Sequence, residues 1–225
     1  SMGGQASYAN TTGFANTSMG YKAAYATTTG YGNTSIGDSA LRSNVLGSNN
    51  VAIGRKTGAL RAAYDNSTFV GQGADASVSG LSNAMALGYN ASVDASNKVV
   101  VGNTSVTSIG GQVGWTTYSD RRLKQNIEAS TLGLDFVMHL NPVTYEYKAE
   151  GQKGIRYTGL IAQEVDEAAK GQFSGVDKNG AYWGIRYAEL TVPLISAIQA
   201  QQTQIDNLAG NTGKVNNAEL DRKSV

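Results

Sequence analysis

A glycine that follows an apolar residue recurs every 17 residues in the first half of the chain, and this repeat restricts the possible folds more than any other feature. The repeated positions are Gly20, Gly37, Gly54, Gly71 and Gly88, and a shorter step of 14 residues leads to Gly102. A unit of this length cannot fold alone, but it suits one coil of a β-solenoid whose strands pair with those of the next coil. We therefore expect residues 1–118 to form an all-β parallel β-solenoid.

The residue before each repeated glycine is apolar, and alternation along a strand would turn it toward the interior of the coil. We expect this interior to be lined by Ile36, Ile53, Val70, Leu87 and Val101. An Ile53→Asp substitution would then bury an unpaired charge and abolish assembly. Because each coil has few aliphatic residues to offset the ordering of its backbone, several chains should pack side by side.

The composition changes near residue 119. Residues 1–118 hold 18 of the 28 glycines, whereas residues 119–225 hold 25 of the 35 charged residues. This shift predicts two domains, 1–118 and 119–225, and the mixed helical and alternating patterns of the second predict an α+β fold.

The charge balance and residue types exclude several classes of partner. A net charge of +1 gives no general attraction for nucleic acid or an anionic membrane, and no apolar run is long enough to span a bilayer. The chain has no cysteine, and its acidic residues are scattered rather than grouped like metal ligands. We expect no nucleic-acid partner, no membrane insertion, no metal and no cofactor.

The segment from residue 188 to residue 208 has a heptad pattern. One seam position holds Thr191, Ile198 and Ile205, and the other holds Leu194, Gln201 and Leu208. This pattern predicts a helix that associates as a trimeric coiled coil, with the polar Gln201 restricting register. The alternative is an amphipathic helix that packs on its own domain.

Ser119 and Lys124 lie at the change of composition and form the most economical catalytic pair in a chain with a single histidine, His139. A serine can attack a carbonyl, and a neutral lysine can accept its proton. Lysine is almost fully protonated in neutral water, so burial or neighbouring positive charge would have to favour the neutral form. Asp120 could orient Lys124 or cap a turn, and Ser119 or Asp120 could simply begin a helix. We expect His139 to be structural.

The repeats resemble a known kind of surface protein. The stretch Ser48–Gly54, Ser-Asn-Asn-Val-Ala-Ile-Gly, is similar to the head repeats of trimeric autotransporter adhesins. This resemblance covers about residues 5–110 and implies a left-handed parallel β-roll in a homotrimer. The irregular stretch from Thr57 to Thr68 departs from that pattern.

The second half resembles the endosialidase-type intramolecular chaperone. The resemblance is carried by residues 119–127, 140–145 and 158–165 and by the closing heptads. It implies a domain at the C-terminus of phage tail fibres and tailspikes that helps three chains fold into a trimer and then cuts itself off. By position, Ser119 would be the nucleophile, Lys124 the base and Asp120 a neighbouring site residue, with the scissile bond between Tyr118 and Ser119.

Two functional hypotheses follow. In the first, the chain is the end of a trimeric phage tail fibre in a virion, with a host-surface receptor or glycan as a further partner and single-turnover cleavage in cis. In the second, it is a non-proteolytic adhesin head on a bacterial surface, and residues 119–225 remain as a permanent trimerisation cap. Intact mass after assembly distinguishes the two hypotheses.

Overall fold

A computed structural model describes residues 1–148 and 152–223 of the chain, with side chains described as far as residue 210. Their contacts divide the chain into two compact units. Unit 1 comprises Ser1–Gly110, Glu146–Ile155 and Asn179–Ala181, and unit 2 comprises Gly111–Tyr145, Arg156–Lys178 and Tyr182–Val225. We expected residues 1–118 and 119–225 to be separate domains, and this boundary remains a prediction.

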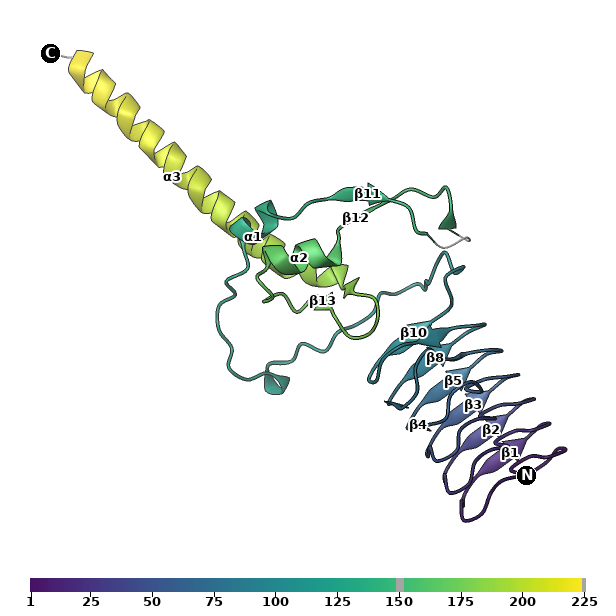
Figure 1. Ribbon diagram of the computed structural model, residues 1–225. Helices are drawn as coiled ribbons and strands as arrows, with labels where there is room; N and C mark the ends of the chain where they lie inside the picture. Colours follow the sequence, from purple (N-terminus) through teal and green to yellow (C-terminus); the bar gives the residue numbers. More distant parts are fainter. Residues whose placement is uncertain (149–151, 224–225) are drawn as a thin grey trace. The chain divides into compact units, whose positions relative to one another are not determined.

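Unit 1 contains a parallel β-solenoid, as the repeat predicts. Each coil adds one short strand to a six-stranded sheet, and the strands stack one above another along the solenoid (Figure 1). In chain order these strands are β1 (Thr17–Met19), β2 (Thr34–Ile36), β3 (Val51–Ile53), β5 (Thr68–Val70), β8 (Met85–Leu87) and β10 (Val99–Val101). Pairing is in register with the repeat, so that Thr17 pairs with Thr34, but Met85 pairs with Val99 because the last coil is shorter.

Two smaller ladders complete the coils in the second part of the solenoid. They consist of β4 (Tyr64–Asp65) with β7 (Leu81–Ser82) and of β6 (Asp75–Ala76) with β9 (Ser92–Val93). Both pairs are parallel and keep the 17-residue step, so Tyr64 pairs with Leu81 and Asp75 with Ser92. The irregular stretch before Thr68 therefore still follows the repeat.

A ladder of asparagine side chains joins successive coils, with Asn33 and Asn50 buried and Asn16 partly buried. Asn16 Oδ1 accepts the backbone N–H of Asn33, Asn33 Oδ1 accepts that of Asn50, and Asn50 Oδ1 accepts that of Ser67, at 2.9 to 3.0 Å. The amide nitrogen of each asparagine donates to a backbone carbonyl 14 residues further on, as Asn50 does to Tyr64 at 2.6 Å. These bonds satisfy backbone groups that would otherwise be buried without partners.

The glycine at the end of each strand is required by the close approach of the next coil. Gly37 has a φ of +129°, and a Cβ atom there would lie 2.5 Å from the carbonyl oxygen of Gly54. A side chain at this position would therefore be strained and would also collide with backbone. This close stacking explains why the glycine keeps its place in every repeat.

The expected interior of the solenoid is wrong by one residue. The middle residue of each three-residue strand points inward, and the inward ladder is Ser18, Ser35, Ala52, Phe69 and Ala86. The aliphatic residue before the glycine faces outward: Ile53 is 40% exposed and Val70 36%, Val101 is also exposed, and Ile36 and Leu87 are partly exposed. Adjacent coils leave room inside mainly for small side chains, so the larger aliphatics occupy the outer face of the strands.

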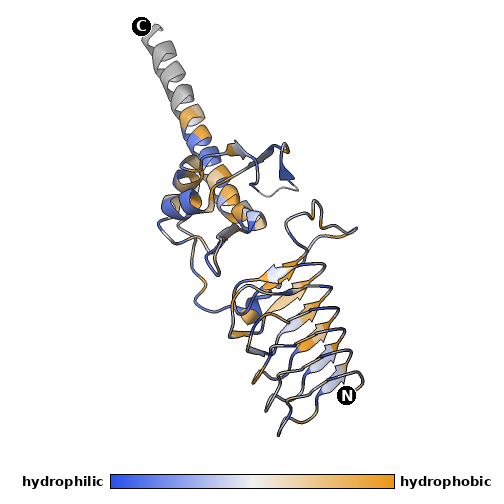
Figure 2. Cartoon of the chain, turned by 45° about the vertical axis from the view of Figure 1, so that its right-hand side comes forward, coloured by the Kyte–Doolittle hydropathy of each residue, from blue (hydrophilic) through white to orange (hydrophobic). Residues whose placement is uncertain are grey.

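We call this outward set the apolar ladder. It consists of Met19, Ile36, Ile53, Val70, Leu87 and Val101, and Figure 2 shows the corresponding hydrophobic colour along the stacked strands. An apolar strip repeated on every coil is an unusual surface for a chain that stays alone in water.

Two aromatic rings pack against each other in the interior of the solenoid. Tyr64 and Phe69 are fully buried, with ring centroids 4.9 Å apart. The Tyr64 hydroxyl donates to Asp75 Oδ1 at 2.5 Å. Burial, together with this hydrogen bond, raises the pKa of Tyr64 far above its usual range, so Tyr64 remains a donor to the carboxylate at neutral pH.

Unit 2 is a small α+β body with a core of Phe136, Val165, Phe173, Val176 and Leu190. Its elements are η1 (Arg121–Leu123), α1 (Leu134–Met138), β11 (Val143–Tyr145), β12 (Tyr157–Gly159), α2 (Ala162–Ala168), β13 (Val176–Asp177), β14 (Gly184–Ile185), η3 (Tyr187–Leu190) and α3 (Thr191–Lys223). The strands form two antiparallel pairs, β11 with β12 and β13 with β14. The α+β prediction is confirmed.

Within its described side chains, which end at residue 210, the long helix α3 is buried against the rest of unit 2 near its start. Leu190, just before it, and Ala197 are buried, and α3 contacts α1. The heptad residues Ile198, Ile205 and Leu208 are exposed. The single chain therefore leaves most of the predicted seam uncovered, and the trimeric coiled coil remains a prediction. Among the described residues, no helix is sufficiently long and apolar to cross a membrane.

Replacing Asn50 with alanine should destabilise the solenoid. The substitution leaves the Ser67 N–H and the Tyr64 carbonyl without their side-chain partner, and each buried group left unsatisfied costs about 1–3 kcal/mol. We expect a lower thermal midpoint by circular dichroism. Asn10→Ala, at an exposed position with local hydrogen bonds only, is the control and should change the midpoint little. Equal midpoints for the two variants would contradict the role of the ladder.

Candidate active site

The junction after the solenoid is an exposed, extended segment. Residues 107–119 form neither helix nor strand, and all of them are exposed. Trp115 is 94% and Tyr118 88% exposed, and both belong to unit 2. The carbonyl of Tyr118, which belongs to the expected scissile bond, is therefore on a segment that no other element of the described chain covers.

Asp120 begins a single turn of 3-10 helix directly after Ser119. Its backbone is extended, with a φ of −64° and a ψ of 135°, and its carboxylate accepts the backbone N–H of Arg122 at 2.8 Å. The Arg122 guanidinium also donates to both carboxylate oxygens, at 2.6 to 3.1 Å. The Arg122 guanidinium beside Asp120 holds the pKa of that carboxyl below its usual range. Asp120 could either orient Lys124 or cap a turn, and in the structure its carboxylate caps the turn.

The same turn brings Lys124 back to Ser119. Lys124 follows η1 in extended conformation, and its backbone N–H donates to the Arg121 carbonyl at 3.1 Å. Its Nζ donates to Ser119 Oγ at 2.7 Å. Two of the three expected site residues, Ser119 and Lys124, are thus in direct contact, whereas Asp120 contacts Arg122.

This contact has the donor and acceptor reversed relative to catalysis. In this hydrogen bond the Lys124 amine donates to the hydroxyl, whereas a general base accepts the serine proton. Ser119 and Lys124 are both exposed to water. The geometry brings the Ser119 hydroxyl and the Lys124 amine into contact at the surface of the chain.

His139 lies apart from this pair. It is the C-cap of α1, and its Nδ1 lies 2.7 Å from the Asp135 carbonyl oxygen and 3.6 Å from Asp135 Oδ1. This local contact agrees with the structural role expected for His139. Within residues 1–148 and 152–223, no three histidine or acidic side chains come together in a group that could hold a metal.

One polar cluster was not predicted from sequence. In unit 1, Asp94 and Lys98 on the last coil bond to the turn Asn179–Ala181. The dipeptide Asn179-Gly180 is a turn signal, but nothing in its sequence indicates which surface the turn contacts.

Residues 119–173 match the model of a peptidase family described as chaperone of endosialidase. The matched range begins at Ser119 and ends before β13. This match confirms the resemblance that the motifs of the second half indicated. The likeness of the solenoid repeats to adhesin heads stays a prediction. No curated protein matches the chain.

The Asp120–Arg122 pair gives a pH prediction. Because the pKa of Asp120 is lowered in the folded turn, the cap is present above the ordinary aspartate pKa and is lost as pH falls through the lowered value. Carbon NMR of the Asp120 carboxyl should show this low midpoint. Arg122→Ala should return the midpoint toward the ordinary value, whereas Arg121→Ala should leave it low. A midpoint unaffected by Arg122→Ala would contradict the pairing.

Proposed function

We propose that residues 119–225 are an assembly chaperone for a trimeric fibre of the phage tail type and that they release themselves by cutting the Tyr118–Ser119 bond once. The contact between Lys124 Nζ and Ser119 Oγ carries this proposal, because it begins the segment that matches a peptidase family. The description of the matched family, chaperone of endosialidase, supports a role in assisting trimer assembly. A virion tail fibre, with a host receptor or glycan as partner, is the setting that this role implies.

The proposed reaction uses only groups of the chain and water. Ser119 Oγ attacks the carbonyl carbon of Tyr118, which precedes it in the chain, while neutral Lys124 accepts the hydroxyl proton. The carbon–nitrogen bond breaks, the Ser119 nitrogen takes up that proton, and an ester joins Tyr118 to the Ser119 oxygen. Water then opens the ester, which yields a carboxylate on Tyr118 and restores the serine hydroxyl.

Assembly would switch the reaction on by removing water from Lys124. In the single chain, the amine is exposed and the neighbouring Arg121 and Arg122 are also exposed. Large apolar side chains flank the site without cover, namely Trp115, Tyr118 and Leu123. A neighbouring chain laid over these side chains would desolvate the amine and favour its neutral form. Cleavage would therefore follow assembly instead of preceding it.

The apolar ladder supports a homotrimer. Burial of aliphatic side chains is favourable by about 25 cal/mol for each Å² removed from water. The single chain leaves this strip exposed or partly exposed along every coil from β1 to β10, and it leaves the α3 seam exposed as well. Association of three chains through these two surfaces would cover both.

Removal of the proposed nucleophile or base should leave the protein uncut. We expect wild-type protein assembled at neutral pH to yield one piece that ends at Tyr118 and one that begins at Ser119, by intact mass. Ser119→Ala lacks the attacking oxygen and Lys124→Ala lacks the base, so each should stay full length while still assembling.

The control for this experiment is Ser108→Ala, which removes another exposed serine from the same connector and should be cut like wild type. The proteolytic proposal is overturned if assembled wild type keeps its full mass, or if Ser119→Ala is cut as fast as wild type. In that case residues 119–225 would act as a permanent trimerisation cap, a function that the exposed heptad residues of α3 favour.

A charge on the apolar ladder should weaken assembly without unfolding the coil. We expect Ile53→Asp to retain the solenoid signal in circular dichroism but to shift the mass measured by light scattering toward the monomer, because Ile53 lies outside the coil. The matched control is Val78→Asp, which alters an exposed valine outside the ladder. A trimer of unchanged stability in Ile53→Asp would show that the ladder is not the interface.

A further inference from the structure

Unit 1 contains segments from both sides of the proposed cut. Ser1–Gly110 precedes the Tyr118–Ser119 bond, whereas Glu146–Ile155 and Asn179–Ala181 follow it. After that bond is broken, unit 1 consists of segments from two separate polypeptides that are held together by non-covalent contacts. What holds Asn179–Ala181 in place decides whether the two products separate.

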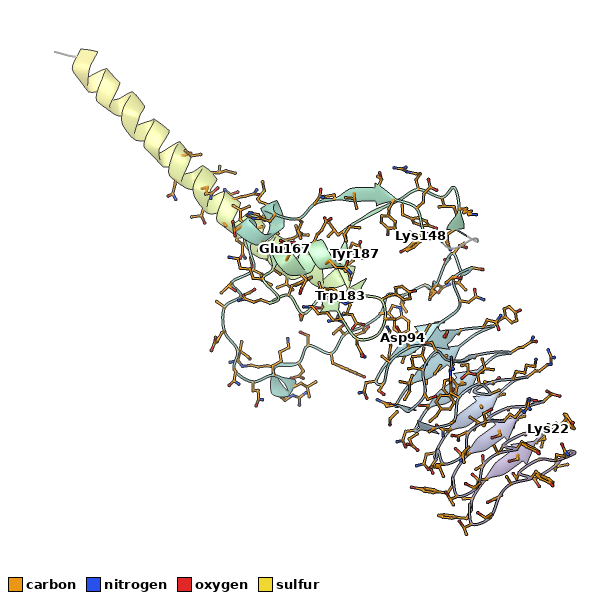
Figure 3. All side chains as sticks on the ribbon, in the orientation of Figure 1. Lys22, Asp94, Lys148, Glu167, Trp183 and Tyr187 are labelled. Atoms are coloured by element: carbon orange, nitrogen blue, oxygen red, sulfur yellow. The ribbon has the colours of Figure 1, made fainter. Side chains whose placement is uncertain are left out.

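The contact is made by the turn between β9 and β10 in the shortened last coil. Asp94, labelled in Figure 3, and Lys98 form an ion pair of 2.8 Å on this turn. Ala181 N–H donates to Asp94 Oδ2 at 2.7 Å, Lys98 Nζ donates to the Asn179 carbonyl at 2.9 Å, and Asn179 Nδ2 donates to the Ser96 carbonyl at 2.9 Å. Two of these three bonds are charge-assisted, which makes them stronger than neutral hydrogen bonds.

The fit around Gly180 is close. Its φ is +113°, and a Cβ atom would lie 2.4 Å from Asp94 Oδ2. Glycine is thus needed both for the backbone conformation and for the approach of the carboxylate. Partial burial works to raise the pKa of Asp94, but the bonds from Lys98 and the Ala181 N–H outweigh it and lower that pKa, so the carboxylate is charged at neutral pH.

Unit 1 contains another polar contact between segments from the two sides of the cut. Gln152 is buried, and its Nε2 donates to the carbonyls of Thr104 and Val106 at 3.3 and 3.4 Å. These bonds are longer and uncharged. The Asp94–Lys98 turn therefore makes stronger polar contacts than these two bonds of Gln152.

We propose that Asn179–Ala181 and the Asp94–Lys98 turn form an electrostatic latch that keeps residues 119–225 bound to the end of the solenoid after the Tyr118–Ser119 bond is broken. The partner that this surface binds is the free C-terminal product, recognised by its Asn-Gly-Ala turn. Cleavage and release are then separate steps, and release is the one controlled by salt, which screens the charges. This inference rests on the proposed cleavage.

The test separates the latch from the chemistry. A recognition sequence for an added protease is placed in the exposed connector, residues 111–117, of full-length Ser119→Ala protein, and the protein is cut there. Native size-exclusion chromatography, and release from resin through a tag on the solenoid piece, then measure how fast the C-terminal piece leaves. We expect retention at low salt and faster loss as salt rises.

Three substitutions should each raise the release rate about tenfold or more, which corresponds to about 1.4 kcal/mol. Asp94→Asn removes the charge, Lys98→Met removes its partner, and Gly180→Ala introduces the clash. The matched control is Gly171→Ala, which has a φ of +74° but no atom within 4 Å of the added Cβ, and it should release like wild type. Circular dichroism of each uncut variant verifies that the solenoid is folded.

The outcomes distinguish the two proposals. If wild type never cuts itself but the protease-cut pieces stay together through Asp94, the cleavage proposal fails and the latch stands. If the pieces separate as fast as they are cut, or if folded Asp94→Asn, Lys98→Met and Gly180→Ala all release at the wild-type rate, the latch is wrong whatever the fate of the Tyr118–Ser119 bond.

Discussion

The in-register stacking of coils is the constraint on which the rest of unit 1 depends. Each coil forms hydrogen bonds with the next. The asparagine side chain of one coil accepts a backbone N–H of the following coil, from Asn16 through Asn33 to Asn50. A ladder of this kind works only if successive coils place a side-chain acceptor at the same height, as Asn33, Asn50 and then Ser67 do. The 17-residue period, the glycine at the strand end and the small inward side chains are consequences of that one requirement.

The period was readable from the sequence, but the direction of each side chain was not. Side chains alternate between the two faces of a strand, so the sequence shows which residues share a face but not which face is the interior. The assumption that the larger aliphatic points inward failed because the middle residue of each strand, such as Ser35 or Ala52, is the buried one, and Ile36 and Ile53 lie on the opposite face. The aliphatic residues that we expected in the core therefore lie on the outer surface.

The sequence predicted the pairing of Ser119 with Lys124, but it did not predict which residue Asp120 contacts. The spacing of Ser119 and Lys124 suggested a contact, which a single helical turn provides. The partner of Asp120 depended on whether Arg122 or Lys124 could reach it, and side-chain reach in an exposed turn leaves no mark in sequence. The contact of Asp94 with Ala181 joins residues far apart in the chain, so only the folded structure could reveal it.

The shortened last coil also sets the length of the solenoid. A stack of parallel strands ends in open backbone groups, and such an edge is a template on which further strands can add. Between β8 and β10 the step falls from 17 residues to 14, so the final coil has a smaller perimeter than those beneath it. Another full-length coil would overhang this perimeter and lose its register. The taper therefore acts as a terminator that opposes end-to-end polymerisation.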